Sequence, residues 1–473
     1  MPYIQRLFYL ARQFMKHTYL LILFSVLLVC QQLSAQSKAV AIDTLLNRLN
    51  QKNLFNGAIV VGQGDSILLS KGYGYANFSN DAPFTVNTPS DGGSIAETLT
   101  ATAVLLLAEQ QKLSLLDSVQ QYIPDYPYSN TKIWNLLTHS TGGLPDYNYY
   151  FGKIPASYVL DAKTMLAVLK EQKPALQYSP YTNFSYNSPG FDMAAAIVER
   201  VSGESYQTFL SKYFFEPLKM NQSFIRPALL NQWPGERIKG YTYENDVLEI
   251  ADIGDREGFY GGSNIWFSAN DLYRWGSSFY HQPILNENLM SIITSWVTIQ
   301  GKLSQLRLGG WYQGRNSNAY YYWGSVAGFY SFIYWDAEKQ FTIAFVSNTN
   351  IPQWVRPQLT AALIDIVEGK KEPVITEPQA EKVDTKQIKS IVGKYTIDKI
   401  GPVEIFLKEN MPYLRLQNEM EYNILQLDDK TFYVPGLDPW ISFQKRQGDT
   451  FQSLVWRTSH SQFSGKRVVD EVK

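Results

Sequence analysis

Cysteine and histidine are both scarce in this chain of 473 residues. The single cysteine, Cys30, lies inside an N-terminal apolar run. If that run is removed on export, the remaining chain can form no disulfide and offers no thiol nucleophile or thiolate ligand. The four histidines are far apart and show none of the short spacings of metal-binding motifs; they are His17, His139, His281 and His460. We therefore predict no metal site and no cofactor.

The chain also lacks a net charge of either sign. Its 42 basic and 43 acidic side chains give a formal net charge of −1. So balanced a chain has no general attraction to nucleic acid or anionic lipid, and we expect no nucleic-acid partner. Hydrophobic residues at 45% and charged residues at 18% are typical of a globular protein with a sizeable core.

The N-terminus has the form of an export signal. Basic residues precede an uncharged apolar run over 19–30, and Leu33-Ser34-Ala35 then offers small residues before the cut. The run is shorter than the ~20 residues of a membrane-spanning helix. We expect a signal peptide over 1–35, cleaved after Ala35, and a periplasmic or extracellular mature protein without a stable transmembrane segment. Lipidation of Cys30 is less favoured, because Val29 is bulkier than the residue that usually precedes a lipidated cysteine.

Hydrophobic patterns predict strands at both ends of the region 40–368, with helices between them. Residues 57–76 have the pattern of a hairpin, and 329–347 that of a second strand pair. The almost wholly apolar stretch 98–110 predicts a helix buried on nearly every side, and a further helix pattern with one break covers 189–213. This arrangement favours an α+β layer architecture.

A linker and a second unit follow this region. Residues 369–386 are rich in charge and proline and poor in apolar side chains, which is typical of an exposed linker. Residues 387–473 consist of short segments that alternate between apolar and polar side chains. They predict a C-terminal all-β module, either a barrel or a sandwich.

Seven short phrases occur in a fixed order along the chain, at 93–101, 112–115, 123–126, 136–145, 184–188, 215–220 and 261–272. Taken together they resemble the serine β-lactamase-like superfamily, which includes class C β-lactamases, D,D-peptidases and esterases. The resemblance covers about 40–365 and, more loosely, 387–473. It implies a β-lactamase/transpeptidase-like fold, with an antiparallel sheet flanked by helices, a helical subdomain, and a cleft between the two.

The family's nucleophile motif, S-x-x-K, is incomplete here. In the family, serine and lysine lie one helical turn apart, so that the amine takes the proton of the serine hydroxyl. Ser94 stands at the serine position, but Glu97 stands at the lysine position. A carboxylate, with a reference pKa of ~4.3, is a weaker base near neutral pH than a neutral amine. It also adds negative charge beside the oxyanion that the reaction forms.

The other two motifs depart from the family as well. The second keeps Tyr186 but has Ser188 in place of asparagine, and the third has Tyr322 at its cationic position. Trp323 and Gly324 follow, which is closer to the Trp-Gly-Gly of the carboxylesterase branch than to the penicillin-recognising branches. Two cationic side chains are thus missing from one cleft, which should attract substrate carboxylates poorly. We assign Ser188, Tyr322, Trp323 and Gly324 to ligand binding.

A structural interpretation of the nucleophile motif is also open. Ser94 and Glu97 satisfy the Ser-x-x-Glu pattern of a capping box at the start of a helix. In this interpretation, which we prefer, the replacement of lysine makes sense without any catalysis. His139 belongs to a family phrase in which the histidine is usually structural, and we assign it no catalytic role.

We interpret the chain as an exported, β-lactamase-related protein that has lost efficient acyl transfer and binds a small molecule, peptide or glycan in the inherited cleft. One alternative is a working serine hydrolase of esterase or peptidase type, in which Ser94 attacks and Glu97 acts as base through water or through Tyr186. Another is a cell-envelope scaffold that interacts through its β-module.

Overall fold

The computed structural model describes residues 15, 35–233, 237–244, 247–281, 286–371, 373–377, 385–398, 400–408, 411–416, 421–428, 430–434, 440–448, 450–457 and 462–468. Nearly all of the predicted signal peptide lies outside the described residues, and so does the middle of the predicted linker. Within the described ranges, no helix is both long and apolar enough to cross a membrane.

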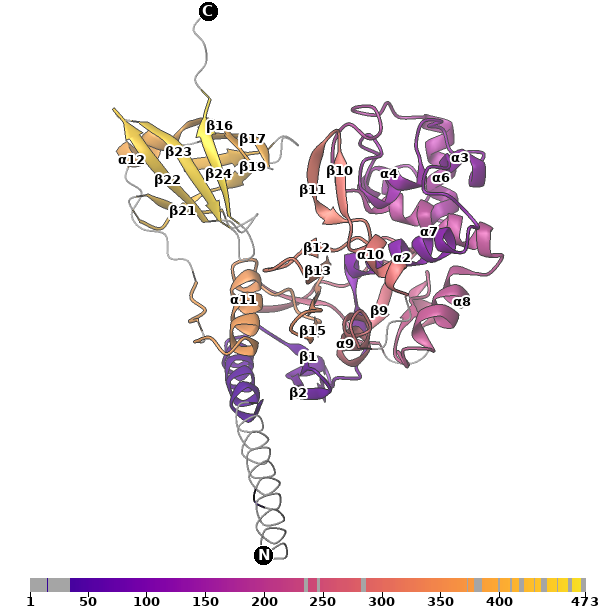
Figure 1. The fold of residues 1–473 in the computed structure, drawn as a ribbon, viewed down its shortest axis with the longest axis horizontal. Helices are drawn as coiled ribbons and strands as arrows, with labels where there is room; N and C mark the ends of the chain where they lie inside the picture. Colours follow the sequence, from indigo (N-terminus) through magenta and orange to yellow (C-terminus); the bar gives the residue numbers. More distant parts are fainter. Residues whose placement is uncertain are drawn as a thin grey trace, which may run out of the picture.

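A mixed-length antiparallel sheet of eight strands forms the centre of the N-terminal unit, in the order β10-β11-β12-β13-β14-β15-β1-β2. The predicted hairpin and the predicted strand pair are both confirmed. They lie side by side in the sheet, where the β1 strand pairs with β15 from Gly57 opposite Ser347 onward. Figure 1 shows the two ends of this unit meeting in the sheet. The strands are β1 (Gly57–Gln63), β2 (Ser66–Tyr73), β10 (Trp296–Ile299), β11 (Lys302–Arg307), β12 (Tyr312–Gln313), β13 (Ala319–Val326), β14 (Phe329–Asp336) and β15 (Phe341–Ser347).

Both faces of the sheet are buried under helices. Along β1, Ala58 and Val60 belong to one hydrophobic cluster and Ile59 and Val61 to another, because successive side chains of a strand point to opposite faces. The helical residues 35–51 and α11 cover the second face. The first face packs against the helical subdomain and α9. The helices are α2 (Ala96–Glu109), α3 (Val119–Tyr122), α4 (Ile133–Leu137), α5 (Tyr147–Phe151), α6 (Ala162–Gln172), α7 (Ser188–Ser202), α8 (Tyr206–Leu210), α9 (Ala269–Ser277), α10 (Glu287–Ile293) and α11 (Val355–Val367).

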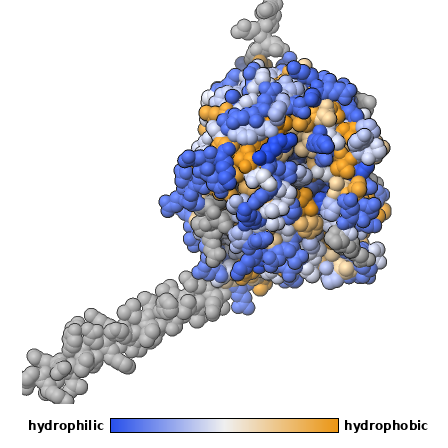
Figure 2. Space-filling view, turned by 90° about the vertical axis from the view of Figure 1, so that its right-hand side faces the viewer, coloured by the Kyte–Doolittle hydropathy of each residue, from blue (hydrophilic) through white to orange (hydrophobic). Residues whose placement is uncertain are grey.

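Helix α2 is the predicted buried helix, and every residue from Ala96 to Leu105 is buried. Helices α7 and α8 confirm the broken pattern over 189–213, with Gly203 in the left-handed conformation at the end of α7. Short strands complete this unit: β3 (Tyr75–Asn77), β4 (Ala82–Pro83), β5 (Ser90–Asp91), β6 (Phe224–Ile225), β7 (Tyr241–Glu244), β8 (Val247–Ile250) and β9 (Ile265–Phe267). On the face shown in Figure 2, hydrophobic residues form small patches among hydrophilic ones, as expected for a folded surface.

The C-terminal module is built on one sheet, in the order β19-β18-β17-β16-β24-β23-β22-β21-β20. This confirms the predicted all-β module, to which the structure adds one short helix, α12 (Thr385–Ile391), at its start. The strands are β16 (Gly393–Ile397), β17 (Gly401–Lys408), β18 (Met411–Arg415), β19 (Glu421–Asn423), β20 (Leu425–Gln426), β21 (Thr431–Tyr433), β22 (Trp440–Gln447), β23 (Thr450–Arg457) and β24 (Gln462–Arg467).

We expect the module to be removable without unfolding the N-terminal unit. In the described ranges, the hydrophobic cluster of the module takes its side chains from Ile391 onward, and the other two clusters take none from it. Units with separate cores fold separately. A chain that ends at residue 377 should keep one cooperative thermal transition, measured by circular dichroism and calorimetry. Loss of that transition in the truncated chain would show that the two units share a core.

Candidate functional site

A short 3₁₀ turn, η1 (Gly93–Ile95), presents Ser94 at the start of α2. Gly93 has a φ of 52°, which glycine adopts without strain. Its N–H donates a hydrogen bond of 2.8 Å to Asp91 Oδ1. From the sheet, Ser331 Oγ donates to the carbonyl of Gly92 at 2.7 Å. The turn is therefore fixed on both sides, and Ser94 at its centre is only half-buried.

Strand β13 lies directly against this turn. A Cβ added at Gly324 would stand 1.8 Å from the carbonyl oxygen of Gly92. A Cβ added at Gly93 would stand 2.8 Å from the backbone nitrogen of Ser325. The predicted site residue Gly324 thus lets the strand approach the nucleophile position closely, and the backbone nitrogen of Ser325 comes beside the same turn.

We expect Gly324→Ala to destabilise the protein by about 2 kcal/mol, because its methyl group must push a rigid backbone carbonyl away. Gly152→Ala is the matched control, since a Cβ there meets nothing within 4 Å and the residue has an ordinary helical conformation. Urea unfolding of both variants measures the difference. Equal midpoints for the two variants would contradict the close approach of β13.

Glu97 is fully buried and lies at the centre of a group of hydroxyls. Its Oε1 accepts hydrogen bonds from Tyr186 at 2.8 Å and from Ser188 at 2.9 Å. Its Oε2 accepts one from Tyr322 at 2.5 Å. An ionised carboxylate is an acceptor without a proton to donate, and three O–H donors suit that form. The carboxylate thus stands where the resemblance places the lysine of the family.

The capping-box interpretation of Ser94 and Glu97 is wrong. The N-cap of α2 is Ile95, and no side chain caps it. Glu97 instead turns away from the helix end toward the second and third motifs. The physical reason is that a buried carboxylate gains more from three O–H donors than from one backbone N–H at the helix start.

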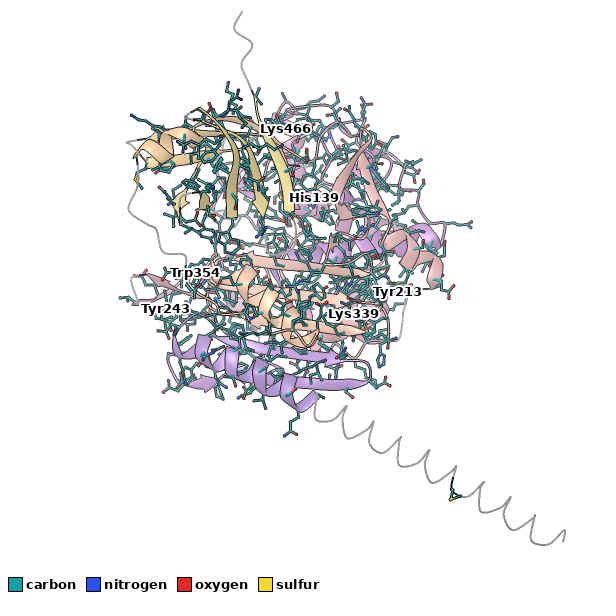
Figure 3. All side chains as sticks on the ribbon, turned by 60° about the vertical axis from the view of Figure 1, so that its left-hand side comes forward. His139, Tyr213, Tyr243, Lys339, Trp354 and Lys466 are labelled. Carbon is teal, nitrogen blue, oxygen red and sulfur yellow. The ribbon has the colours of Figure 1, made fainter. Side chains whose placement is uncertain are left out.

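His139 is a contact that the sequence analysis missed. Its Nε2 lies 3.4 Å from Glu97 Oε2, and its ring packs on that of Tyr186 with centroids 4.5 Å apart. Its Nδ1 accepts the backbone N–H of Asn187 at 3.0 Å. Because a protonated imidazole has no lone pair to accept with, His139 is neutral and carries its proton on Nε2. Its place in the interior is labelled in Figure 3.

The Tyr186 hydroxyl donates to Glu97 and accepts from Ser188 Oγ at 3.3 Å. Burial of this hydroxyl raises the pKa of Tyr186 well above its usual range, and the charge of Glu97 raises it further. Hydrogen bonds with Ser188 and Ser94 act in the opposite direction. The residue as a whole remains 45% exposed. Tyr186 and Glu97 are therefore hydrogen-bonded to each other, and Ser94 lies just before the first turn of α2, which contains Glu97.

The third motif separates into a buried and an exposed part. Tyr322 is buried, and its pKa is raised by burial and by the charge of Glu97. Trp323 points outward, 37% exposed. Its ring stacks on Tyr312, with centroids 4.9 Å apart, and on Tyr321, with centroids 5.8 Å apart. Among the four residues assigned to binding, Ser188 and Tyr322 thus contact Glu97, while Trp323 is exposed and stacks on other aromatic rings.

Within the described part of the chain, Glu97 forms no ion pair with a lysine or arginine, and the His139 imidazole beside it is neutral. The same residues contain no group of three or more histidine, cysteine, aspartate or glutamate side chains that could hold a metal ion. The site thus offers a hydroxyl nucleophile, a tyrosine and a carboxylate, without an amine.

Known proteins resemble the chain over most of its length. Penicillin-binding protein 4* of Bacillus subtilis (strain 168) is 22% identical over 428 residues, which cover 86% of this chain and 94% of that protein. Teichoic acid D-alanine hydrolase of Staphylococcus aureus (strain MRSA252) is 29% identical over 230 residues, or 48% of this chain and 55% of that protein. This chain therefore spans little more than half of the second relative.

The fold is similar to that of the octameric penicillin-binding protein homologue from Pyrococcus abyssi. The TM-score is 0.61 at 19% identity, and the similarity covers 90% of this chain and 99% of the other. The family model described as Beta-lactamase matches residues 41–368, which is most of the chain and includes every site residue named above. The chain therefore belongs to the Beta-lactamase family of serine hydrolases.

Proposed function

We propose that this protein is exported, binds an acylated ligand at the Ser94 site and has lost efficient serine acyl transfer. The observation that carries the proposal is the buried Glu97 at the position of the lysine, with its carboxylate held by three hydroxyls. The relatives named for penicillin binding and for D-alanine hydrolysis support an acyl group as part of the ligand.

The geometry gives a physical reason for slow acyl transfer. The Tyr186 proton is already donated to Glu97, so Tyr186 can take the proton of Ser94 only by passing its own proton to Glu97. The final acceptor is a carboxylate, which is a weak base. The oxyanion that forms on the substrate would stand near the negative charge of Glu97, which opposes its stabilisation.

A working esterase is the second candidate, and one observation favours it. Tyr186 donates to Glu97, and the influence of Ser94 on the pKa of the same hydroxyl is that of a neighbouring group, which would give a chain of groups from the nucleophile to the carboxylate. A carboxylate at the end of such a chain can serve as a general base in principle. In that case, Glu97 would receive the serine proton through Tyr186 during attack on an ester.

Labelling with a fluorophosphonate probe distinguishes the two candidates. Wild-type protein should show no more labelling than Ser94→Ala, because an unactivated serine hydroxyl is a poor nucleophile. Intact-mass spectrometry counts the adducts. A stoichiometric adduct on Ser94 of the wild type, together with ester turnover, would establish the working esterase instead.

A further inference from the structure

The C-terminal module contains a cavity of its own, of about 480 Å³. Its walls come from α12, from the segment before β21, and from the hairpin of β22 and β23. Figure 1 shows α12 and β22 on the side of the module that is turned away from β10 and β11. Small-molecule sites typically measure ~300–1,000 Å³. The cavity therefore has room for more than a simple ion, and it shares no residue with the Ser94 site.

The lining of this cavity carries three positive charges. Lys430, Lys445 and Arg446 line it, and none of the described lining residues is acidic. Within the described part of the chain, none of the three forms an ion pair, whereas Arg415 of the same module pairs with Glu421 at 2.8 Å. The charges of the lining are thus available to an anionic ligand.

Two further charges lie next to the lining. Asp428 is not a lining residue, and its Oδ1 accepts the backbone N–H of Lys430 at 2.8 Å. Arg467 donates from Nε to the carbonyl of Phe451 at 2.6 Å and from Nη2 to the carbonyl of Ser390 at 3.1 Å. It thereby holds the α12 wall against the β23 wall. Because these two charges are opposite in sign, they leave the positive excess of the lining unchanged.

The backbone of β22 turns Arg446 into the cavity. Phe443 and Arg446 are three positions apart and would face opposite sides of a regular strand, yet both line the cavity. Between them, Lys445 adopts the left-handed conformation with a φ of 52°, which is strained for a residue other than glycine. Strain of this kind is concentrated at ligand sites. The guanidinium of Arg446 comes to lie 5.7 Å from the centre of the Phe451 ring.

We propose that this cavity binds the phosphate group of a phosphate monoester, with the apolar part of the ester against Phe443 and Phe451, which also line it. A phosphate monoester carries a charge of about −1.5 to −2 near pH 7 and three acceptor oxygens, so it can meet three cations at once. A carboxylate offers a single charge and two oxygens. The inference concerns a second site and does not depend on acyl transfer at Ser94.

Calorimetry on the full chain with phenyl phosphate, inorganic phosphate and benzoate tests the proposal. Phenyl phosphate should bind at least about fivefold more tightly than either of the others, because it alone combines the phosphate charge with an apolar ring. An increase in NaCl from about 50 to about 500 mM should weaken its binding by about fivefold or more, since exposed charges are screened by salt. Absence of phenyl phosphate binding, or equal binding of benzoate, would overturn the proposal.

Variants of the lining residues locate the site. Lys445→Asn removes a charge and keeps the left-handed backbone, which asparagine tolerates. Combined with Lys430→Gln and Arg446→Gln, it should weaken phenyl phosphate binding by about tenfold or more. Lys430→Gln alone lies outside the strands, should weaken binding by about threefold, and remains decisive if the triple variant does not fold. Lys466→Gln is the matched control, because Lys466 is exposed on the same module and does not line the cavity.

The remaining outcomes decide whether the site is the cavity and where its ligand comes from. Equal weakening in Lys466→Gln, or unchanged affinity in Lys430→Gln and the triple variant, would place phosphate binding elsewhere and overturn the proposal. Sedimentation with vesicles that contain phosphatidic acid distinguishes the sources of the monoester. Co-sedimentation of the wild type that is lost in the triple variant would support a lipid headgroup. Binding of phenyl phosphate without co-sedimentation would support a soluble ester.

Discussion

Replacement of Glu97 by lysine is expected to raise esterase activity above that of the wild type, if the proposed loss of acyl transfer holds. Position 97 faces the Tyr186 hydroxyl and lies one helical turn from Ser94, so the new amine would stand within reach of the nucleophile. Ser188→Asn supplies in addition the amide that holds the lysine in the family. Because general-base catalysis contributes ~10²–10⁴-fold, the double variant should exceed the wild type by about 10²-fold or more. Nitrophenyl acetate turnover is the measurement.

Two controls accompany this experiment. Ser94→Ala in the double variant measures the rate that does not depend on the nucleophile. Glu97→Gln removes the negative charge without adding an amine, so it should gain little. A Ser94-dependent rate in the wild type that falls in Glu97→Lys would show that Glu97 itself works as a base. The two candidate functions therefore predict opposite signs for one substitution.

The sequence predicted the fold well wherever hydrophobic spacing decides the structure. The apolar run of β1 and the two strands β14 and β15 are visible as patterns, and so is the largely apolar α2. Such patterns could not predict that β1 pairs with β15. The paired residues Gly57 and Ser347 lie at opposite ends of the unit in the sequence. Helix α12 was missed because its short segment is mostly polar.

Prediction of the site was limited by contacts between distant residues. The ordered family phrases predict Ser94, Tyr186 and Gly324 at one site, and the structure places Gly324 against the turn that carries Ser94 and Tyr186 on Glu97. The local Ser-x-x-Glu pattern, however, cannot indicate which way a carboxylate turns. Tyr322, a donor that helps to turn Glu97 inward, lies 225 positions away along the chain. The approach of His139 to Glu97 depends on a left-handed backbone, with a φ of 49°, that no spacing rule predicts.

Penicillins and cephalosporins are expected to leave Ser94 unmodified. Acylation needs an activated serine, and here the amine is replaced by Glu97. It also needs recognition of the carboxylate that these compounds carry, whereas the cationic position is occupied by Tyr322, which is buried and donates to Glu97. The negative charge of the site repels the same carboxylate. Incubation with benzylpenicillin should therefore give no stoichiometric adduct by intact-mass spectrometry.

A triple variant, Glu97→Lys with Ser188→Asn and Tyr322→Lys, tests this explanation directly. It restores the base, the amide and the cation, so slow formation of an adduct on Ser94 should appear. The double variant without Tyr322→Lys keeps a nucleophile but no cation at that position, and it should turn over nitrophenyl acetate while reacting poorly with penicillin. This separation of ester turnover from penicillin acylation would assign the two missing functions to two different residues. A stoichiometric penicillin adduct on wild-type Ser94 would contradict both assignments, since it would require activation and carboxylate recognition by a site that offers neither an amine nor a cation.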